Sequence, residues 1–332
     1  MKAVVYTQYG LPEVLHLTEV ATPIPKDNEV LIKVAAVSVN RSDWENLTGK
    51  PLYARIGGLL KPRHLILGSD IAGRVELAGS NIRHFHPGDE VFGHILSYTG
   101  GFAEYVCVPE QALALKPASM TFEEVAAIPE AGLIALQGLR DKGQVQPGQQ
   151  VLINGAGGGA GSFAVQLAKF YGAEVTGVDH TDKLDLLRSL GADYVIDYTW
   201  EDFTKTGKQY DLILDLAASR SVFAYARALR SRGRYLMVGG SVATLFQVVL
   251  LGPWMRSKHI RLLMVHPNAK DLVFLTELYE EGRVVPLIDR RYPLREVALA
   301  LRYLGEGHAK GKVVITVQPN DHTEHSPQHS TS

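Results

Sequence analysis

The residues best suited to chemistry lie in a glycine-rich segment in the middle of the chain. An apolar run over residues 151–153 leads into Asn-Gly-Ala-Gly-Gly-Gly-Ala-Gly at 154–161, and a helical pattern begins at once. Glycine suits a backbone that turns sharply and lets a pyrophosphate approach with no Cβ in the way. The helix that follows would point free N–H groups at this anion. We therefore expect a dinucleotide cofactor to contact Gly155, Gly158, Gly159, Ala160 and Gly161.

An acidic residue follows the glycines at the distance that a dinucleotide site requires. The run over 173–178 ends in Asp179, about twenty positions further on, where a carboxylate accepts hydrogen bonds from the adenosine ribose hydroxyls. Because this carboxylate would repel a 2′-phosphate, the sequence favours NAD(H). Lys183 and His180 could pair with a phosphate, so NADP(H) stays possible. Alternatively, Asp179 only caps the next helix.

The elements around this segment predict an α/β fold. Strand-like and helical runs alternate from residue 151 to residue 240, which indicates a parallel sheet with helices on both faces. Residues 1–122 look mostly β, as short runs between Pro and Gly turns, which indicates a small irregular barrel. Thr121 and Glu124 form a capping box where helical character begins.

Length and pattern predict two domains in the 332 residues. We expect 1–122 and 286–318 to form one domain and 123–285 the other, with a disordered tail over 319–332 that is rich in His, Ser and Pro.

Composition narrows the function classes. A net charge of −1 argues against broad binding to nucleic acid or to an anionic membrane. The single cysteine, Cys107, excludes an intrachain disulfide and a multi-cysteine zinc cluster. The N-terminus lacks a signal-peptide pattern, and the longest apolar run, 242–255, is too short to span a bilayer. We expect a cytoplasmic protein with no integral membrane association.

Several short sequence blocks follow one another in order along the chain. Besides the glycine loop, they are Asn40-Arg-Ser-Asp43, Leu67-Gly-Ser-Asp-Ile-Ala-Gly73, Pro87-Gly-Asp-Glu-Val-Phe92, Gly101-Phe-Ala-Glu-Tyr105, Pro147-Gly148, Leu190-Gly-Ala192, Asp197-Tyr198 and Gly311-Lys-Val-Val314. These blocks resemble the medium-chain dehydrogenase/reductase superfamily, and within it the zinc-free quinone oxidoreductase branch. The resemblance covers residues 1 to about 317, and within the branch the chain looks like the group of reticulon-interacting mitochondrial and chloroplast-envelope oxidoreductases. It implies a GroES-like β-barrel domain plus a Rossmann domain with a doubly wound parallel sheet.

The resemblance also implies roles for residues outside the loop. Tyr198 matches a position beside the adenosine, and Asn40 one that lines the cleft near nicotinamide or substrate. Ile134 stands where many relatives carry a threonine that contacts the cofactor. The positions that match the nicotinamide half are Val238, Gly239, Gly240 and Lys312.

The same resemblance predicts that no zinc is bound. The three positions that hold catalytic zinc in zinc-dependent relatives correspond here to Asn40, Ser69 and Glu130. A lone carboxylate cannot replace the thiolate and imidazole ligands that zinc prefers. Without a Lewis acid, an unactivated alcohol is hard to deprotonate, whereas a quinone or an α,β-unsaturated carbonyl accepts hydride readily.

Such a reduction needs a donor for the developing oxyanion. By similarity to enoyl-reductase relatives, Tyr53 is the candidate catalytic donor, together with Asn40 in the cleft; the alternative is that Tyr53 only lines the cleft. Asp43 orders the Asn40 loop through local hydrogen bonds in one interpretation and has a cleft role in the other.

Two further surfaces stay open to interpretation. A basic run near Tyr53 (Arg55, Lys61, Arg63 and His64) would attract an acidic acceptor or is simply solvated. The apolar segment 242–255 would line a pocket for a lipophilic quinone, lie in a homodimer interface, or contact a membrane surface. We expect a homodimer.

The leading hypothesis is a zinc-independent oxidoreductase that transfers hydride from NAD(P)H to a small electrophilic acceptor, a quinone, enal or enone. The alternatives are an enoyl-thioester reductase, and a weakly active relative that binds cofactor or RNA. The near-neutral charge weakens the RNA-binding alternative, and we expect no nucleic-acid partner.

Overall fold

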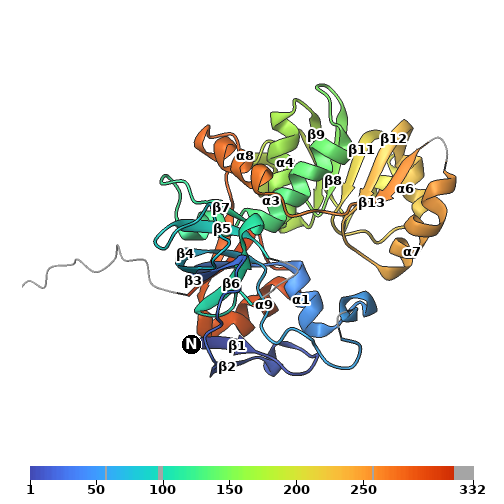
Figure 1. Ribbon diagram of the computed structural model, residues 1–332. Coiled ribbons are helices and arrows are strands. Elements are labelled where there is room, and N and C mark those ends of the chain that lie inside the picture. The colour runs from blue at the N-terminus through green and yellow to red at the C-terminus, as the bar shows by residue number, and fades with distance from the viewer. Residues whose placement is uncertain (57, 96–99, 256–257, 318–332) are drawn as a thin grey trace, which may run out of the picture.

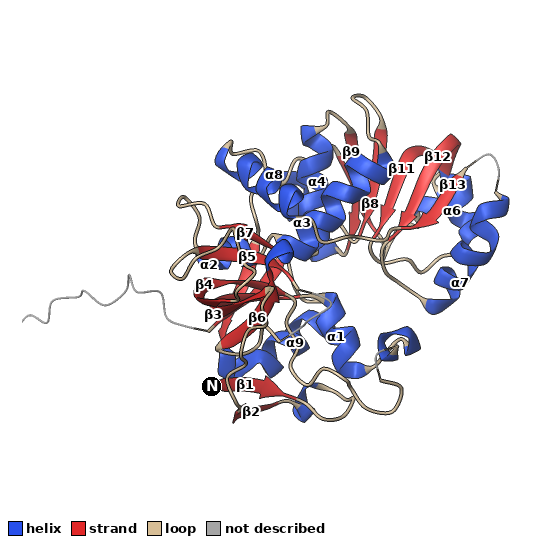
Figure 2. Cartoon of the chain, in the orientation of Figure 1, coloured by secondary structure: helices blue, strands red, loops and turns tan. Residues whose placement is uncertain are grey.

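The computed structural model describes residues 1–56, 58–95, 100–255 and 258–317. The middle of the chain forms the upper part of the molecule in Figures 1 and 2, and both ends of the chain contribute to the lower part. The tail predicted over 319–332 lies outside the described residues. Among the described residues, no helix has both the length and the apolar character needed to cross a bilayer.

The upper part is built on a six-stranded parallel sheet. Its order is β10-β9-β8-β11-β12-β13, so β8, the first of these strands in the chain, lies inside the sheet between β9 and β11. Apolar side chains of α3, α4 and α8 pack on one face, and those of α6 and α7 on the other. The predicted doubly wound Rossmann sheet is confirmed. The strands are β8 (Gln150–Asn154), β9 (Glu174–Asp179), β10 (Tyr194–Asp197), β11 (Tyr210–Asp215), β12 (Leu229–Met237) and β13 (His259–Leu262).

The helices of this part begin and end near the predicted runs. The apolar segment 242–255 folds as α7 followed by a 3-10 turn, η7 (Gly252–Trp254). The α-helices are α3 (Pro129–Leu136), α4 (Gly159–Phe170), α5 (Leu184–Ser189), α6 (Val222–Ala228), α7 (Val242–Leu251) and α8 (Ala269–Glu280).

The lower part is a second domain with its own apolar core. Its main sheet has the order β14-β15-β3-β4-β5-β7, and β6 also pairs with β3. A separate antiparallel pair, β1 and β2, is joined to the rest by isolated bridges. The strands are β1 (Lys2–Val5), β2 (His16–Glu19), β3 (Glu29–Val39), β4 (Asp70–Ala78), β5 (Glu90–His94), β6 (Tyr105–Pro109), β7 (Leu113–Leu115), β14 (Ile288–Pro293) and β15 (Lys312–Thr316).

The return of the C-terminal strands positions the site. Antiparallel pairing of β15 with β3 sets Val313 opposite Val39, so Lys312 lies next to Asn40 at the end of β3. Helix α9 (Val297–Gly305) packs beneath this sheet. The two parts meet where α2 (Phe122–Ala126) and α3 leave the lower sheet. As predicted, α2 begins with a capping box between Thr121 and Glu124.

One helix of the lower part was not expected from the sequence. Helix α1 (Arg41–Thr48) begins directly after Asn40 and ends at Gly49, whose φ is +60°. The carboxylate of Asp43 accepts hydrogen bonds from the Asn40 N–H (2.9 Å) and the Gly68 N–H (2.9 Å). Asp43 therefore orders the start of α1 and ties it to the segment before β4, which is the local role that one of the two interpretations gave it.

The tight glycine turn leads to a stability prediction. A Cβ on Gly161 would lie 2.2 Å from the carbonyl oxygen of Gly155 and 2.5 Å from that of Ala156, whereas a Cβ on Gly158 would have no atom nearer than 3.6 Å. We expect Gly161→Ala to lower the free energy of unfolding by about 1–3 kcal/mol, because the backbone must shift. Gly158→Ala, the matched control, should cost less than about 1 kcal/mol. Urea unfolding of both variants would measure this, and equal losses would contradict it.

Candidate active site

The glycine loop lies at the carboxyl ends of the parallel strands. Gly155, with φ +82°, turns the chain out of β8, and Gly158 is the N-cap of α4. Gly159, Ala160 and Gly161 form the first turn of α4, so their N–H groups have no partner within the helix. In open α/β sheets ligands bind beside the carboxyl ends of the strands, where the strand order reverses. The loop therefore has the geometry of an anion cradle.

The predicted adenosine end surrounds Asp179 at the end of β9. This buried carboxylate accepts hydrogen bonds from the N–H groups of Gly157 (2.7 Å) and His180 (2.8 Å). The ammonium of Lys183 lies 3.8 Å from it and donates to the carbonyl of Gly307 in the lower part (3.1 Å). The exposed Tyr198 ring lies next to the His180 ring, at 6.0 Å between centroids. The structure thus places all four predicted residues together.

The residues predicted for the nicotinamide half follow the neighbouring strands. Val238, Gly239 and Gly240 come directly after β12, and Gly240 bridges to Ala218 beyond β11. A Cβ on Gly240 would lie 2.2 Å from the Ala218 carbonyl oxygen, so only glycine fits. Ile134 lies on α3, half-buried against the apolar core of the sheet.

Lys312 connects this cradle to the lower part. A bridge joins Gly158 to Gly311, and a Cβ on Gly159 would lie 2.8 Å from Cδ of Lys312, so the lysine stem covers the start of α4. Its ammonium donates to Oδ1 of Asn40 and lies 3.5 Å from Oδ2 of Asp70. One side chain therefore reaches from the glycine loop to Asn40, both predicted to bind cofactor.

A buried charge network surrounds the Lys312 ammonium. Nδ1 of His94 lies 2.7 Å from Oδ1 of Asp70, and the N–H of Glu130 donates to both Asp70 oxygens (3.1 Å each). Burial alone would raise the pKa of Asp70, but the His94 hydrogen bond and the Lys312 charge outweigh it and lower that pKa. Burial would lower the pKa of His94, yet its bond to Asp70 raises it. Asp70 is thus held ionised between the Lys312 ammonium and the His94 imidazole.

Comparison with known proteins agrees with this architecture. A model for the alcohol dehydrogenase GroES-like domain matches residues 26–118, and a model for zinc-binding dehydrogenases matches residues 190–315. The chain is 37% identical to a 2-methylene-furan-3-one reductase of Solanum lycopersicum, over 95% of this chain and 79% of that protein. It is 31% identical to a chloroplast envelope quinone oxidoreductase homolog of Arabidopsis thaliana, over 95% of this chain and 98% of that protein.

Solved structures are also similar. A quinone oxidoreductase of Coxiella burnetii superposes with a TM-score of 0.87 at 31% identity, covering 96% of this chain and 99% of that one. An Escherichia coli quinone oxidoreductase in complex with NADPH has a TM-score of 0.84 at 25% identity, covering 96% and 100%. The chain belongs to the medium-chain dehydrogenase/reductase superfamily, in its quinone oxidoreductase branch. The family resemblance inferred from the motifs is confirmed.

One of the two matching family models describes zinc-binding dehydrogenases. The residues at the zinc positions of this medium-chain dehydrogenase/reductase therefore decide whether it can hold zinc. The structure brings all three together: Nδ2 of Asn40 donates to Oγ of Ser69 (3.3 Å), which donates to Oε2 of Glu130 (3.4 Å). Only Glu130 offers an anionic ligand, and the Lys312 ammonium already occupies the Asn40 oxygen. Asp70, His94 and Glu130 place potential ligand atoms within 4.8 Å of one another, but Asp70 is saturated by its partners. This donor set does not fit zinc.

The hydroxyl of Tyr53 has a hydrogen-bond partner outside this cluster. Tyr53 lies on a 3-10 turn, η2 (Leu52–Arg55), is 38% exposed, and its hydroxyl donates to Oε2 of Glu45 (3.2 Å). Burial and the neighbouring Glu45 raise the pKa of Tyr53 to about 12. In the described part of the chain, no hydrogen bond joins Tyr53 to Asn40, Ser69 or Glu130. Its role as donor stays a prediction.

Sequence reasoning missed the Asp70–His94 pair. The two residues are 24 positions apart, and only the antiparallel register of β4 and β5 sets them opposite each other. The signal that could have found them is a carboxylate that begins one strand and a histidine that ends the next, each beside apolar residues. A second missed network joins buried Asp215 to Asn154 (2.7 Å) and to the Tyr235 hydroxyl (2.9 Å) at the ends of β11 and β8.

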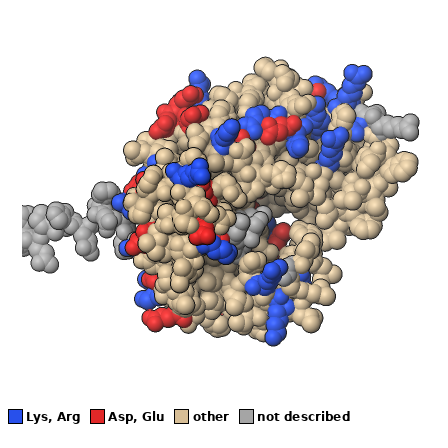
Figure 3. Space-filling view, viewed as in Figure 1, with Lys and Arg blue, Asp and Glu red and all other residues tan. Residues whose placement is uncertain are grey.

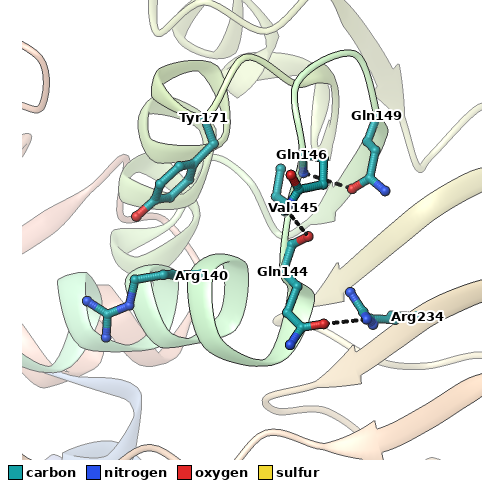
Figure 4. Close-up of a pocket in the computed structure, with 7 residues that line it drawn as sticks. All are labelled: Arg140, Gln144, Val145, Gln146, Gln149, Tyr171 and Arg234. Atoms are coloured by element: carbon teal, nitrogen blue, oxygen red, sulfur yellow. Dashed lines mark hydrogen bonds between the residues drawn. The ribbon is translucent and has the colours of Figure 1, made fainter.

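A pocket at the opposite edge of the Rossmann sheet is separate from this site. It has a volume of about 540 Å³ and lies between a π-helical turn, η4 (Gln137–Gly143), and the start of β8 (Figure 4). Arg234 there donates to Oε1 of Gln144 (2.6 Å), and Arg140 pairs with Asp271 (2.8 Å). Its residues adjoin the amino ends of the strands, so they cannot contact a cofactor in the glycine loop. They are Arg140, Gln144, Val145, Gln146, Gln149, Tyr171 and Arg234.

The burial of the Lys312 ammonium leads to a second stability prediction. Both Lys312 and Asp70 are buried, and removing one partner of a buried pair leaves an uncompensated charge. We expect Lys312→Met to lower the free energy of unfolding by about 3 kcal/mol. Lys205→Met, which breaks an exposed pair with Asp202 at 3.9 Å, is the control and should cost less than about 1 kcal/mol. Similar losses for the two variants would show that the Lys312 charge is not critical.

Proposed function

We propose that the protein is a zinc-independent oxidoreductase that uses NAD(P)H to reduce quinones or α,β-unsaturated carbonyls. The observation that carries the proposal is the junction at Lys312, where the glycine cradle meets the Asn40–Ser69–Glu130 chain on a quinone oxidoreductase fold. The names of relatives support the substrate class, since they include a quinone oxidoreductase homolog and an NADPH-dependent alkenal/one oxidoreductase of Arabidopsis thaliana.

The residues of the chain would bind, orient and polarise. The bound nicotinamide supplies hydride when the cofactor is present. The N–H groups at the start of α4 would hold its pyrophosphate, and Gly239 and Gly240 would lie beside the nicotinamide half. The side chains of Asn40 and Ser69 lie at the junction where an acceptor oxygen can find a hydrogen-bond donor.

The absence of a suitable zinc donor set restricts the chemistry. Nothing in the Asn40–Ser69–Glu130 set lowers the pKa of an alcohol as a Lewis acid would. An acceptor that delocalises negative charge onto its own conjugated oxygen needs only positioning and a hydrogen-bond donor. This favours quinones, enals and enones over simple ketones.

Exposed apolar side chains support a lipophilic acceptor. The surface is hollowed between the two parts of the molecule (Figure 3), and α7 and η2 lie on opposite sides of this opening (Figure 1). Phe246 on α7 is 65% exposed, and Ile56 beside η2 is 89% exposed. Burial of α7 in a homodimer is the alternative, and the homodimer stays a prediction. Cytoplasmic location also stays a prediction, and the relatives include proteins named as chloroplastic or mitochondrial.

For the cofactor we propose a preference for NAD(H). Asp179 at the end of β9 supports it, because a carboxylate there binds ribose hydroxyls and repels a 2′-phosphate. Lys183 and His180 adjoin Asp179 and carry the groups that could pair with a phosphate, so NADP(H) remains a second cofactor. The E. coli structure that contains NADPH shows that a similar fold holds the phosphorylated form.

A cofactor and acceptor panel tests the function. Loss of the reduced-nicotinamide absorbance is expected with small quinones and enals, before and after treatment with a chelator. Simple alcohols with NAD⁺ should give no turnover, and an enoyl-CoA ester in the panel tests the enoyl-thioester alternative. Loss of all activity on chelation, with recovery on adding zinc, would overturn zinc independence. If the protein reduced none of the acceptors in the panel, the proposed function would be overturned.

The role of Asp179 is tested by substitution with serine. Asp179→Ser removes the ribose acceptor and the charge that opposes a 2′-phosphate, so the ratio of kcat/KM for NADPH over NADH should rise about tenfold or more, equivalent to about 1.4 kcal/mol. Asp185→Ser removes a fully exposed carboxylate on the neighbouring α5 and is the control. An unaltered ratio in Asp179→Ser would mean that Asp179 does not select the cofactor.

A further inference from the structure

Glu130 combines burial with an unengaged carboxyl oxygen. It lies in the first turn of α3 and is half-buried. Both hydroxyl donors that reach it, Ser42 Oγ (2.8 Å) and Ser69 Oγ (3.4 Å), bind the same oxygen, Oε2. Within the described residues, Oε1 has no hydrogen-bond partner. Oε1 is therefore the atom on which a transferable proton can reside.

Hydrogen bonds connect this carboxyl to the cofactor cradle. Ser69 accepts from the amide of Asn40, and the oxygen of that amide accepts from Lys312, whose stem covers Gly159. Each link is a direct contact, so Glu130 lies at the junction where the nicotinamide half is expected. Tyr53, the other candidate donor, instead donates to Glu45.

The charges around Glu130 favour its neutral form. Burial raises the pKa of Glu130, and the negative charge of Asp70 raises it further. His94 and Lys312 oppose this, as does the position in the first turn of α3, where the helix dipole stabilises a carboxylate. Asp43 also faces Glu130, and burial raises its pKa to about 7. Burial and the negative charge of Asp70 outweigh these opposing effects, so the pKa of Glu130 is raised overall.

We propose that Glu130 is the general acid that protonates the reduced acceptor. This inference rests on the proposed function. After hydride has added to the β-carbon of an enone, the O–H bond of Glu130 breaks and its proton forms a C–H bond at the α-carbon of the enolate. For a quinone the proton forms an O–H bond on the hydroquinone anion. The electron pair of the O–H bond stays on Glu130 as a carboxylate.

Ser42 supplies the route by which the proton is replaced. Its hydroxyl donates to Oε2 of Glu130, and Ser42 is only half-buried, on the first turn of α1. Solvent water returns one proton per turnover through this hydroxyl to Oε2, and rotation of the carboxyl group about its Cγ–Cδ bond exchanges the two oxygens and restores the donor. Hydride, one proton and the acceptor therefore balance against the reduced product, with no further oxidant or reductant.

Glu130→Gln tests the assignment, since the amide keeps the shape of the side chain and has no acidic proton. We expect kcat to fall by about 10²–10⁴-fold, with cofactor affinity measured by calorimetry unchanged. Wild-type activity should fall as pH rises through the raised pKa of Glu130, and the variant should lose this dependence. Glu130→Asp should recover part of the rate. Glu201→Gln, the same change at an exposed carboxylate, is the control and should leave kcat unaltered.

Infrared spectra give a readout without turnover. The difference between wild type and Glu130→Gln, at neutral pH and without cofactor, should contain the C=O stretch of a protonated carboxyl. A carboxylate band in its place, or wild-type kcat in Glu130→Gln, would overturn the assignment. Wild-type kcat in Tyr53→Phe together with a slow Glu130→Gln supports it, and the reverse pattern would assign the proton to Tyr53. Failure of the proposed function is distinguishable, because the wild-type protein would then reduce no acceptor.

Discussion

The contact of Lys312 with Asp70 and Asn40 is the interaction on which the rest of the site depends. Lys312 is the first residue of β15, a strand of the lower sheet. The methylene chain of its side chain lies against the first turn of α4 in the upper part. A buried ammonium is costly unless charged and polar partners surround it. Asp70 provides that partner, so the same pair fixes the end of β3, the domain junction and the floor of the cradle.

Local spacing explains what could be predicted from the sequence. The glycine loop and Asp179 belong to one βαβ unit, so their distance in the chain determines their distance in space. The three zinc positions, Asn40, Ser69 and Glu130, were predicted through the family, and they do meet. The Asp70–His94 pair depends on the register between two strands, and a single sequence does not specify register between distant strands. The position of the Tyr53 hydroxyl depends on the path of a turn, which a single sequence does not specify either.

The distribution of protons in the junction follows from its charge balance. Three carboxyl groups, Asp70, Asp43 and Glu130, share a region with the Lys312 ammonium and the His94 imidazole. In a medium of low dielectric constant a further uncompensated charge is expensive. Asp70 contacts both groups directly and stays ionised. The other two carboxyls have hydrogen-bond donors but no direct cationic partner among the described residues, so burial raises their pKa values.

This balance also limits what an internal cation can do in place of a metal. A zinc ion would have an open coordination position and could bind a substrate oxygen directly. The Lys312 ammonium is instead engaged by Asp70 and by the Asn40 carbonyl, so little of its field is left for an acceptor. Such a site polarises substrate weakly and must take acceptors that carry their own charge sink. The proton, and not the positive charge, then becomes the group that the protein has to supply, which is why a neutral carboxyl at the junction matters more than the cation beside it.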